Sequence, residues 1–386
     1  MENKMLTTRP SSTRKNSRTR RGQLRSVAVA TSAMLSVVTF SACSSTEATG
    51  DDEGASGEVM VYDGGGAWGE AQRIAYFEPF EEETGIRVIP AAGEAPPALR
   101  TTIEAGNPSM DVMNIGANTV QEWVDADLLL PIDIESWTSA DPADLQPFAA
   151  DEYSVPSLIY AAQIAYDPEV VGGEIEDWAD FFDVATFPGE RTLGEGMNIT
   201  TGTLEAALLA DGVDPASLYP LDVERALDKL KELTPSILKF WGTGAESVQL
   251  LTDGQVGATA AWNGRVAAAQ EQAPGIASTW NQAILQLDVW TIPEGAKNEE
   301  NAQRFIEFAS RPDRQAEFAQ LITYSPTNAR AFESIDADRQ KLLPTAPEHV
   351  DATIMSDSSW WGSDSGNGEL WSTRVVTMWQ EWLADL

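Results

Sequence analysis

The regular alternation of strand-like and helix-like segments along residues 58–133 is the feature that most constrains the fold. EVMVYD at 58–63, IRVIPAA at 86–92 and DVMNIG at 111–116 are strand-like, and the segments between and after them carry apolar residues at helical spacing. Such alternation indicates an α/β fold with parallel strands. Ligands of such sheets bind at the carboxyl ends of the strands, which here are VYDGGG and NIGAN.

The glycine run after the first strand matches a nucleotide-binding pattern in spelling only. Gly64, Gly66 and Gly69 fit G-x-G-x-x-G, but that fingerprint also requires an acidic residue that closes the next strand and binds the ribose. IRVIPAA ends without one, and the acids at 81–83 precede it, just before the helix-capping Gly85. The run therefore predicts a sharp turn and a close approach of a ligand to the backbone. Trp68 follows it and faces either the core or a cleft.

The N-terminus has the organisation of an export signal. A basic stretch precedes the apolar run VAVATSAMLSVVTF, which ends just before Cys43, the only cysteine. Residues 1–42 are therefore predicted to be a signal peptide and are excluded from the fold. TRRGQLR at 19–25 resembles a twin-arginine signal, with Gln23 in place of the usual aromatic residue.

The residues around Cys43 resemble a bacterial lipobox. Small Ser41 and Ala42 precede the cysteine, while Phe40 replaces the usual leucine. The resemblance implies a lipid anchor on Cys43, and an ordinary signal peptide with a chance cysteine is the alternative. Residues 43–57 are small, polar and acidic, which is typical of a flexible tether. We expect an exported protein, lipid-anchored to the outer face of the cytoplasmic membrane.

The remaining body is strongly acidic. Eight of the 25 Lys and Arg and one of the 60 Asp and Glu precede Cys43, so the rest holds 17 basic against 59 acidic residues, a net charge of −42. Nucleic acid is excluded as a partner, because phosphate binding requires a basic surface. No apolar run after the signal is long enough to span a bilayer, so the body is expected to be soluble.

About 330 residues are more than one hydrophobic core usually serves, so two lobes are expected. The segment from about 160 to 286 carries a second α/β set, and LQLDVWTIP at 285–293 is a strand that returns to the first. We predict one lobe from residues 58–160 plus 287–328, and the other from 161–286 plus 329–386.

Residues that usually serve catalysis are scarce. His349 is the only histidine, so a Ser/His/Asp triad, a Cys/His pair and a zinc cluster are not predicted. Pairs of acids could serve a glycosidase, but acids are too numerous for any pair to be informative. Neither an enzyme nor a cofactor is predicted.

Tryptophan is unusually frequent, with all 13 in the body. Trp262 precedes Asn263-Gly264 where strand gives way to helix, so its ring can stack on a ligand. Trp360 and Trp361 lie among serine and glycine, where two core tryptophans together would be unusual. Trp361 is therefore a candidate ligand contact. Helical spacing assigns four others to the core: Trp123, Trp178, Trp379 and Trp382.

Ordered motifs over residues 57–386 carry a family resemblance. They include GEVMVYDGGGAWGEAQRIAYFEPFEEETGIRV, IEDWADFFDVATFPGERTL, AAWNGR, LDVWTIPEGAKNEENAQRFIEFASRPD and YSPTN. Together they resemble the spermidine/putrescine-type solute-binding proteins of bacterial ABC transporters. The resemblance implies an α/β, two-lobed periplasmic-binding-protein fold of type II. It also implies a monomer that closes on its ligand and delivers it to a membrane permease.

The resemblance also implies site residues. Asp288 matches the carboxylate that binds the amine, and Gln286 replaces an aromatic residue of the polyamine binders. Only Glu195 could substitute for the acidic pair expected after RTL. The other matching positions are Trp68, Gly116, Asn118, Trp262 and Tyr324. The ligand is predicted to be a small organic cation such as putrescine or spermidine; a sugar or other neutral solute and a secreted carbohydrate-active enzyme are the alternatives.

Overall fold

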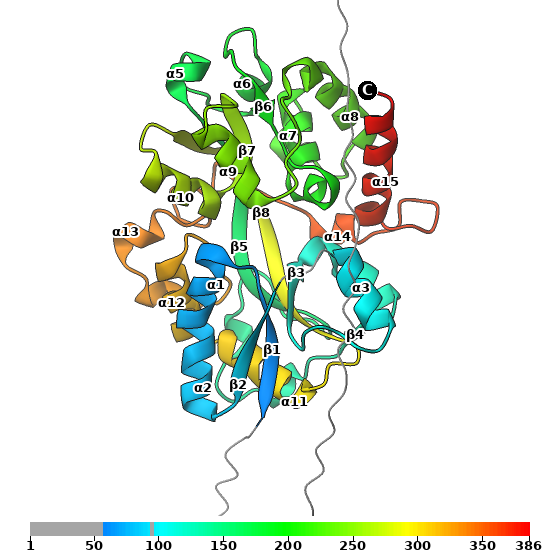
Figure 1. Ribbon diagram of the computed structural model, residues 1–386, viewed down its shortest axis with the longest axis vertical. Helices are drawn as coiled ribbons and strands as arrows, with labels where there is room; N and C mark the ends of the chain where they lie inside the picture. The colour runs from blue at the N-terminus through cyan, green and yellow to red at the C-terminus, as the bar shows by residue number, and fades with distance from the viewer. Residues whose placement is uncertain (1–56, 93–95) are drawn as a thin grey trace, which may run out of the picture. The chain divides into compact units, whose positions relative to one another are not determined.

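A computed structural model describes residues 57–92 and 96–386, and the predicted signal, tether and Cys43 lie outside this range apart from Gly57. Its centre is a mixed sheet built on two long antiparallel strands, β5 (Val155–Tyr166) and β8 (Ala277–Pro293), which lie side by side (Figure 1). The sheet order is β10-β8-β5-β7-β6, with β3 and β4 also on β8 and β9 also on β5.

The first strands form the predicted strand–helix–strand unit. β1 (Glu58–Asp63) pairs in parallel with β2 (Arg87–Ala92), and Val112 bridges to Val61 in parallel. The helical segment between them comprises α1 (Gly66–Gln72), the π-helical η1 (Arg73–Phe77) and α2 (Glu78–Thr84). It ends where Gly85 adopts φ 71°, a left-handed conformation that suits glycine, and donates its N–H to Glu81 O.

The parallel arrangement predicted from residues 58–133 holds for β1, β2 and the Val61–Val112 bridge but does not extend to the central strands. β3 (Met113–Gly116) and β7 (Ala258–Trp262) run antiparallel to β8 and β5, respectively. The reason is that β8 is a single strand of 17 residues that pairs along its length with several others. Alternating strands and helices predicted the local unit correctly but gave no information on this long return strand.

Short strands complete this sheet, and helices and 3-10 turns make up most of the remaining structure. The short strands are β4 (Leu129–Leu130), β6 (Arg191–Thr192), β9 (Ser325–Pro326) and β10 (Ile354–Met355). The helices are α3 (Pro96–Glu104), α4 (Val120–Asp125), α5 (Pro168–Val171), α6 (Trp178–Phe182), α7 (Thr203–Ala210), α8 (Val223–Leu233), α9 (Gly244–Thr252), α10 (Asn263–Gln272), α11 (Glu299–Ala309), α12 (Pro312–Leu321), α13 (Ala337–Gln340), α14 (Ser358–Trp361) and α15 (Trp371–Ala384). The 3-10 turns that matter below are η2 (Ala117–Thr119) and η5 (Gly196–Thr201).

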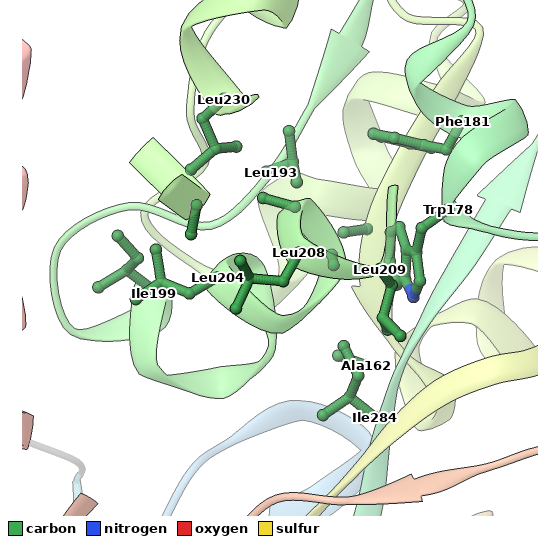
Figure 2. Packing of buried hydrophobic residues seen from close by; sticks show 14 of the residues in the cluster. Ala162, Trp178, Phe181, Leu193, Ile199, Leu204, Leu208, Leu209, Leu230 and Ile284 are labelled. Carbon is green, nitrogen blue, oxygen red and sulfur yellow. The ribbon is translucent and has the colours of Figure 1, made fainter. Parts of the chain in front are cut away.

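Two large hydrophobic clusters lie along the central strands. One packs β1 and the helices α2, α11 and α12 against Val155, Leu158 and Trp290. The other packs α6, α7, α8 and α15 against Ala162 and Ile284. Figure 2 shows members of this cluster, with Leu209 of α7 beside Trp178. Because β5 and β8 contribute to both clusters, each of these strands carries the chain from one cluster to the other.

A buried carboxyl group in the second cluster predicts how stability varies with pH. Glu205 on α7 is fully buried, and Tyr219 Oη donates to its Oε1 at 2.6 Å. Burial raises the pKa of Glu205 to about 7, above its value of about 4.3 in an unfolded chain. The protonated Glu205 side chain therefore contributes fully to the stability of the folded state below about pH 4. This contribution to the unfolding free energy is lost as the pH rises through 7.

Exchanging this glutamate for glutamine is expected to remove that pH dependence. Between pH 5 and pH 8 the unfolding free energy of wild type should fall by roughly 2–3 kcal/mol more than that of Glu205→Gln. Urea unfolding at both pH values measures the difference, with Glu224→Gln, an exposed acid on α8, as the matched control. Equal pH profiles for wild type and Glu205→Gln would contradict the assignment.

Candidate functional site

A cavity of about 150 Å³ lies where β1 and β3 end beside β8. Its wall holds a ring of aromatic side chains, one acid and one base. The lining residues are Tyr62, Trp68, Asn114, Ile115, Gly116, Leu158, Tyr160, Trp262, Arg265, Asp288 and Tyr324. They come from β1, α1, β3, β5, β7, α10, β8 and the residue before β9, so the fold assembles the cavity from segments across most of the chain.

Aromatic rings enclose the cavity and contact one another. Tyr62 and Trp68 have ring centroids 5.3 Å apart, and Tyr160 meets both Trp262 (5.8 Å) and Tyr324 (6.2 Å) edge to face. Edge-to-face contacts fix the orientation of rings that are only partly supported by a core. The arrangement presents apolar ring surfaces on several sides of a small space.

Glycines make room for the rings of Trp68 and Trp262. A Cβ atom on Gly64 would lie 2.2 Å from the Trp68 ring, and one on Gly244 would lie 2.5 Å from the Trp262 ring. Contacts of that length do not occur, so only glycine fits at these positions. The glycine run after β1 therefore seats the indole of Trp68 against the backbone.

Asp288 is the acid of the cavity. It lies on β8, opposite Gly116 of β3, and has no hydrogen bond or ion pair with any described residue. Burial raises the pKa of Asp288 to about 7, because no neighbouring charge compensates for the loss of water. A cation beside it would restore the ionised form.

Arg265 is the base of the cavity, and the sequence reasoning missed it. It lies on α10, forms no ion pair within the described part of the chain, and its Nε is buried without a hydrogen-bond partner. A Cβ on Gly66, where φ is 58°, would be 3.8 Å from Arg265 Nη1, so the glycine run borders the guanidinium. The signal was present, since Arg265 directly follows the Trp-Asn-Gly motif.

Further polar atoms around the cavity also lack partners. The indole nitrogens of Trp68 and Trp262 and Oδ1 of Asn114 are buried without a hydrogen bond among the described residues. A buried donor or acceptor without a partner costs about 1–3 kcal/mol. Their grouping at one cavity supports a polar ligand as the missing partner.

Three predicted site residues lie elsewhere. Asn118 is buried in η2 and donates through Nδ2 to Thr200 O (3.2 Å) and Thr200 Oγ1 (3.0 Å). Glu195 is exposed at the start of η5 and does not line the cavity. Five predicted residues do line it: Trp68, Gly116, Trp262, Asp288 and Tyr324.

Trp361 is a core residue, which corrects its assignment as a ligand contact. Asp357 caps the short helix α14 by accepting from Trp360 N, and this helix turns Trp361 fully into the second hydrophobic cluster. Its indole nitrogen donates to Ser356 Oγ at 3.2 Å. Trp360 instead stacks on Trp371, with ring centroids 5.0 Å apart.

Two further properties bear on the class of protein. No helix in the described ranges is long and apolar enough to cross a membrane. Residues 57–92 and 96–386 also hold no group of three or more His, Cys, Asp or Glu side chains arranged to bind a metal ion.

Sequence comparison relates the chain to known proteins. Residues 75–345 match the family model described as bacterial extracellular solute-binding protein. The chain is 34% identical over 309 residues to the γ-aminobutyric acid-binding protein of Pseudomonas aeruginosa, covering 78% of this chain and 86% of that protein. It is 25% identical over 304 residues to the spermidine/putrescine-binding periplasmic protein of Escherichia coli, covering 76% and 84%.

Solved structures give the same relationship. An ABC transporter substrate-binding protein from Bradyrhizobium japonicum superimposes with a TM-score of 0.76 at 34% identity, covering 85% of this chain and 99% of the other. A γ-aminobutyric acid (GABA) receptor superimposes with a TM-score of 0.75 at 30% identity, covering 85% and 98%.

Proposed function

Because this chain belongs to the bacterial extracellular solute-binding proteins, we propose that it captures a small solute that carries both an ammonium and a carboxylate group. Family membership makes it the substrate-binding receptor of an ABC importer, acting outside the cytoplasm, and its relatives are transport proteins rather than enzymes. The same matches confirm the predicted α/β periplasmic-binding-protein fold. The nature of the solute is the open question.

The presence of one unpaired acid and one unpaired base in the same cavity carries the proposal. Asp288 and Arg265 both line it, and neither has an ion-pair partner among the described residues. An isolated buried charge is costly unless it is paired. A ligand with one positive and one negative group pairs both, whereas a ligand with two like charges places one of them beside a like-charged side chain.

The aromatic wall suits a short methylene chain between the two charged groups. Trp68, Trp262 and Tyr324 line the cavity, and aromatic rings offer apolar surface to a methylene chain and attract an ammonium group over their faces. The cavity is smaller than the roughly 300–1,000 Å³ that drug-sized ligands occupy. γ-Aminobutyrate has this chemistry, and a relative at 34% identity is a γ-aminobutyric acid-binding protein. We infer that the ligand is γ-aminobutyrate or a similar short ω-amino acid.

A polyamine, predicted from the sequence resemblance, is the second candidate. Asp288 and the rings favour one ammonium group, and spermidine/putrescine-binding proteins are relatives at 25% identity. The second ammonium of a diamine would lie in a cavity that also holds the Arg265 guanidinium. Like charges in a site of low dielectric repel strongly, so we place the diamine second.

Calorimetry with ligand-free protein distinguishes these candidates. The panel is γ-aminobutyrate, putrescine, butylamine and butyrate. Putrescine replaces the carboxylate with a second ammonium group, butylamine lacks the carboxylate, and butyrate lacks the ammonium group. We expect γ-aminobutyrate to bind at least about 100-fold more tightly than the other three, since each leaves one buried charge unpaired. Tighter binding of putrescine than of γ-aminobutyrate would reject the proposal.

Binding is expected to weaken at low pH because of Asp288. Its pKa of about 7 in the free protein means that a proton must leave before the carboxylate can pair with an ammonium group. Affinity should be constant between about pH 8 and 9, where the ligand's ammonium group is still protonated, and fall about tenfold per pH unit below 7. Titrations at pH 8 and pH 5 measure this, and Glu205→Gln should keep the dependence because that acid lies outside the cavity. A flat profile from pH 8 to 5 would contradict it.

We also propose that the two predicted lobes close on the ligand about β5 and β8. The strands connect the two hydrophobic clusters, and the Asn118–Thr200 hydrogen bonds join η2, which follows β3, to η5, which precedes α7. Asn118 thus holds the predicted lobe that contains η2 against the lobe that contains η5, and it does not line the cavity.

Asn118→Ala is therefore expected to weaken γ-aminobutyrate binding by about 10-fold through faster dissociation, because one side-chain amide donates both bonds. Stopped-flow dissociation rates measure the effect. Asn107→Ala, at an exposed asparagine, is the control. A dissociation rate equal to that of wild type would show that these bonds do not hold the bound state.

A further inference from the structure

The cavity lies at the N-terminal end of the ten-residue helix α10. Trp262 is the N-cap of this helix, Arg265 lies in its first turn, and both line the cavity. The first N–H groups of an α-helix have no partner within the helix, and no side chain caps this end of α10. The first turn also holds no acidic residue. The partial positive charge of this helix end is therefore not compensated by the helix's own side chains.

Asn263, the first residue of α10, holds the helix start in place. Its Oδ1 accepts from Ala161 N of β5 at 2.9 Å, and its Nδ2 donates to Thr323 O. The amide group of Asn263 thus bonds to two neighbouring segments and not to the first turn of α10. It also fixes the backbone directly before Tyr324 against the helix start.

Tyr324 lies against this helix end with a free hydroxyl group. A Cβ atom on Gly264 would lie 2.6 Å from Tyr324 Cζ and 2.8 Å from its Oη, so only glycine leaves room for the tyrosine. Tyr324 lines the cavity and is 7% exposed, and its hydroxyl forms no hydrogen bond within the described residues. Buried polar groups usually have a partner, so this hydroxyl points to a group supplied by the ligand.

The groups that meet at this end of the cavity are mainly donors. A guanidinium and a backbone N–H can only donate a hydrogen bond, and a tyrosine hydroxyl can donate as well. A carboxylate only accepts, with two oxygens, and helix N-termini bind such anions through their free N–H groups. A carboxamide would instead bring two N–H donors of its own against these donors.

We propose that the ligand's carboxylate is bound at the N-terminus of α10, where first-turn N–H groups and the Tyr324 hydroxyl act together with Arg265. The proposal rests on the proposed function, because it requires a ligand with a carboxylate group. It narrows the substrate class to ω-amino acids with a free carboxylate and excludes their amides. Asn263 is a positioning residue in this account, since it holds the helix end and Tyr324 together without lining the cavity.

Tyr324→Phe tests the hydroxyl, because it removes the oxygen and keeps the ring. We expect γ-aminobutyrate to bind about 10- to 100-fold more weakly, as for one lost hydrogen bond to a charged group. Butylamine, which has no carboxylate, should change by less than about twofold. The thermal stability of the free protein should not fall, since the hydroxyl has no partner there. Tyr153→Phe, at a tyrosine outside the cavity, is the matched control and should bind γ-aminobutyrate as wild type does.

Nuclear magnetic resonance of the ¹⁵N-labelled wild-type protein tests the helix end without any substitution. The amide proton of Gly264 or of Arg265 should shift downfield with γ-aminobutyrate and not with butylamine, because only the former brings a carboxylate acceptor. 4-Aminobutanamide should bind at least about tenfold more weakly than γ-aminobutyrate, because its amide donors face donors.

A loss of less than about tenfold for γ-aminobutyrate in Tyr324→Phe, or an equal loss for butylamine, would overturn the role of the hydroxyl. Identical amide shifts with γ-aminobutyrate and butylamine would overturn the role of the helix end. Absence of γ-aminobutyrate binding by wild type would instead reject the proposed function, so the two failures are distinguishable.

Discussion

Replacing Asp288 with asparagine is expected to weaken γ-aminobutyrate binding by about 100- to 1,000-fold. Asparagine keeps the size of the side chain but removes the negative charge that pairs with the ligand's ammonium group. Removing one partner of a buried pair costs about 3–5 kcal/mol, and each 1.4 kcal/mol is a factor of about ten in affinity. Isothermal calorimetry at pH 8, where Asp288 is ionised, measures the loss.

The control for this variant is Asp253→Asn, the same change at an exposed position after α9. Both variants make the net charge less negative by one unit, so the control isolates the local pairing from long-range attraction. The thermal stability of Asp288→Asn should not fall, because the variant removes an acid that burial disfavours. A loss of less than about tenfold would contradict a direct ammonium–Asp288 pair.

Replacing Arg265 with glutamine is expected to reverse the preference of the cavity. γ-Aminobutyrate should bind about 100-fold more weakly, because its carboxylate loses a charged hydrogen-bond donor. Putrescine should bind more tightly than it does to wild type, because the guanidinium no longer repels its second ammonium. Competition between the two ligands, followed by tryptophan fluorescence, measures the reversal in one experiment.

Arg265→Lys separates charge from geometry. A lysine keeps the charge but lacks the planar fork that binds a carboxylate with two donors, so an intermediate affinity for γ-aminobutyrate is expected. If Arg265→Gln binds both ligands with the affinities of wild type, the Arg265 guanidinium does not contact the ligand.

Much of the fold could be predicted from local sequence. β1 and β2, the helices α8, α11 and α15 and the N-capping of α6 by Asp177 follow from apolar spacing and capping residues. The antiparallel pairing of β5 and β8 could not, since strand direction depends on contacts between residues more than a hundred positions apart.

Site residues that lie within a recognisable sequence motif could be predicted. Trp262 and Asp288 were identified from the segments that contain them, and both line the cavity. Arg265 was missed, although it directly follows the Trp-Asn-Gly motif, because an arginine on a helix is more often a surface charge than a ligand contact. Trp361 was misassigned because serine and glycine around it resemble a loop, whereas Asp357 caps a helix there and buries the ring.

The most direct test of the central claim is a crystal structure of the protein with γ-aminobutyrate. The account predicts the ligand in the cavity between Trp68 and Trp262, with its nitrogen within hydrogen-bonding distance of the Asp288 carboxylate and its carboxylate on the Arg265 guanidinium. A ligand bound outside this cavity, or inside it with neither charged group facing its opposite, would contradict the account.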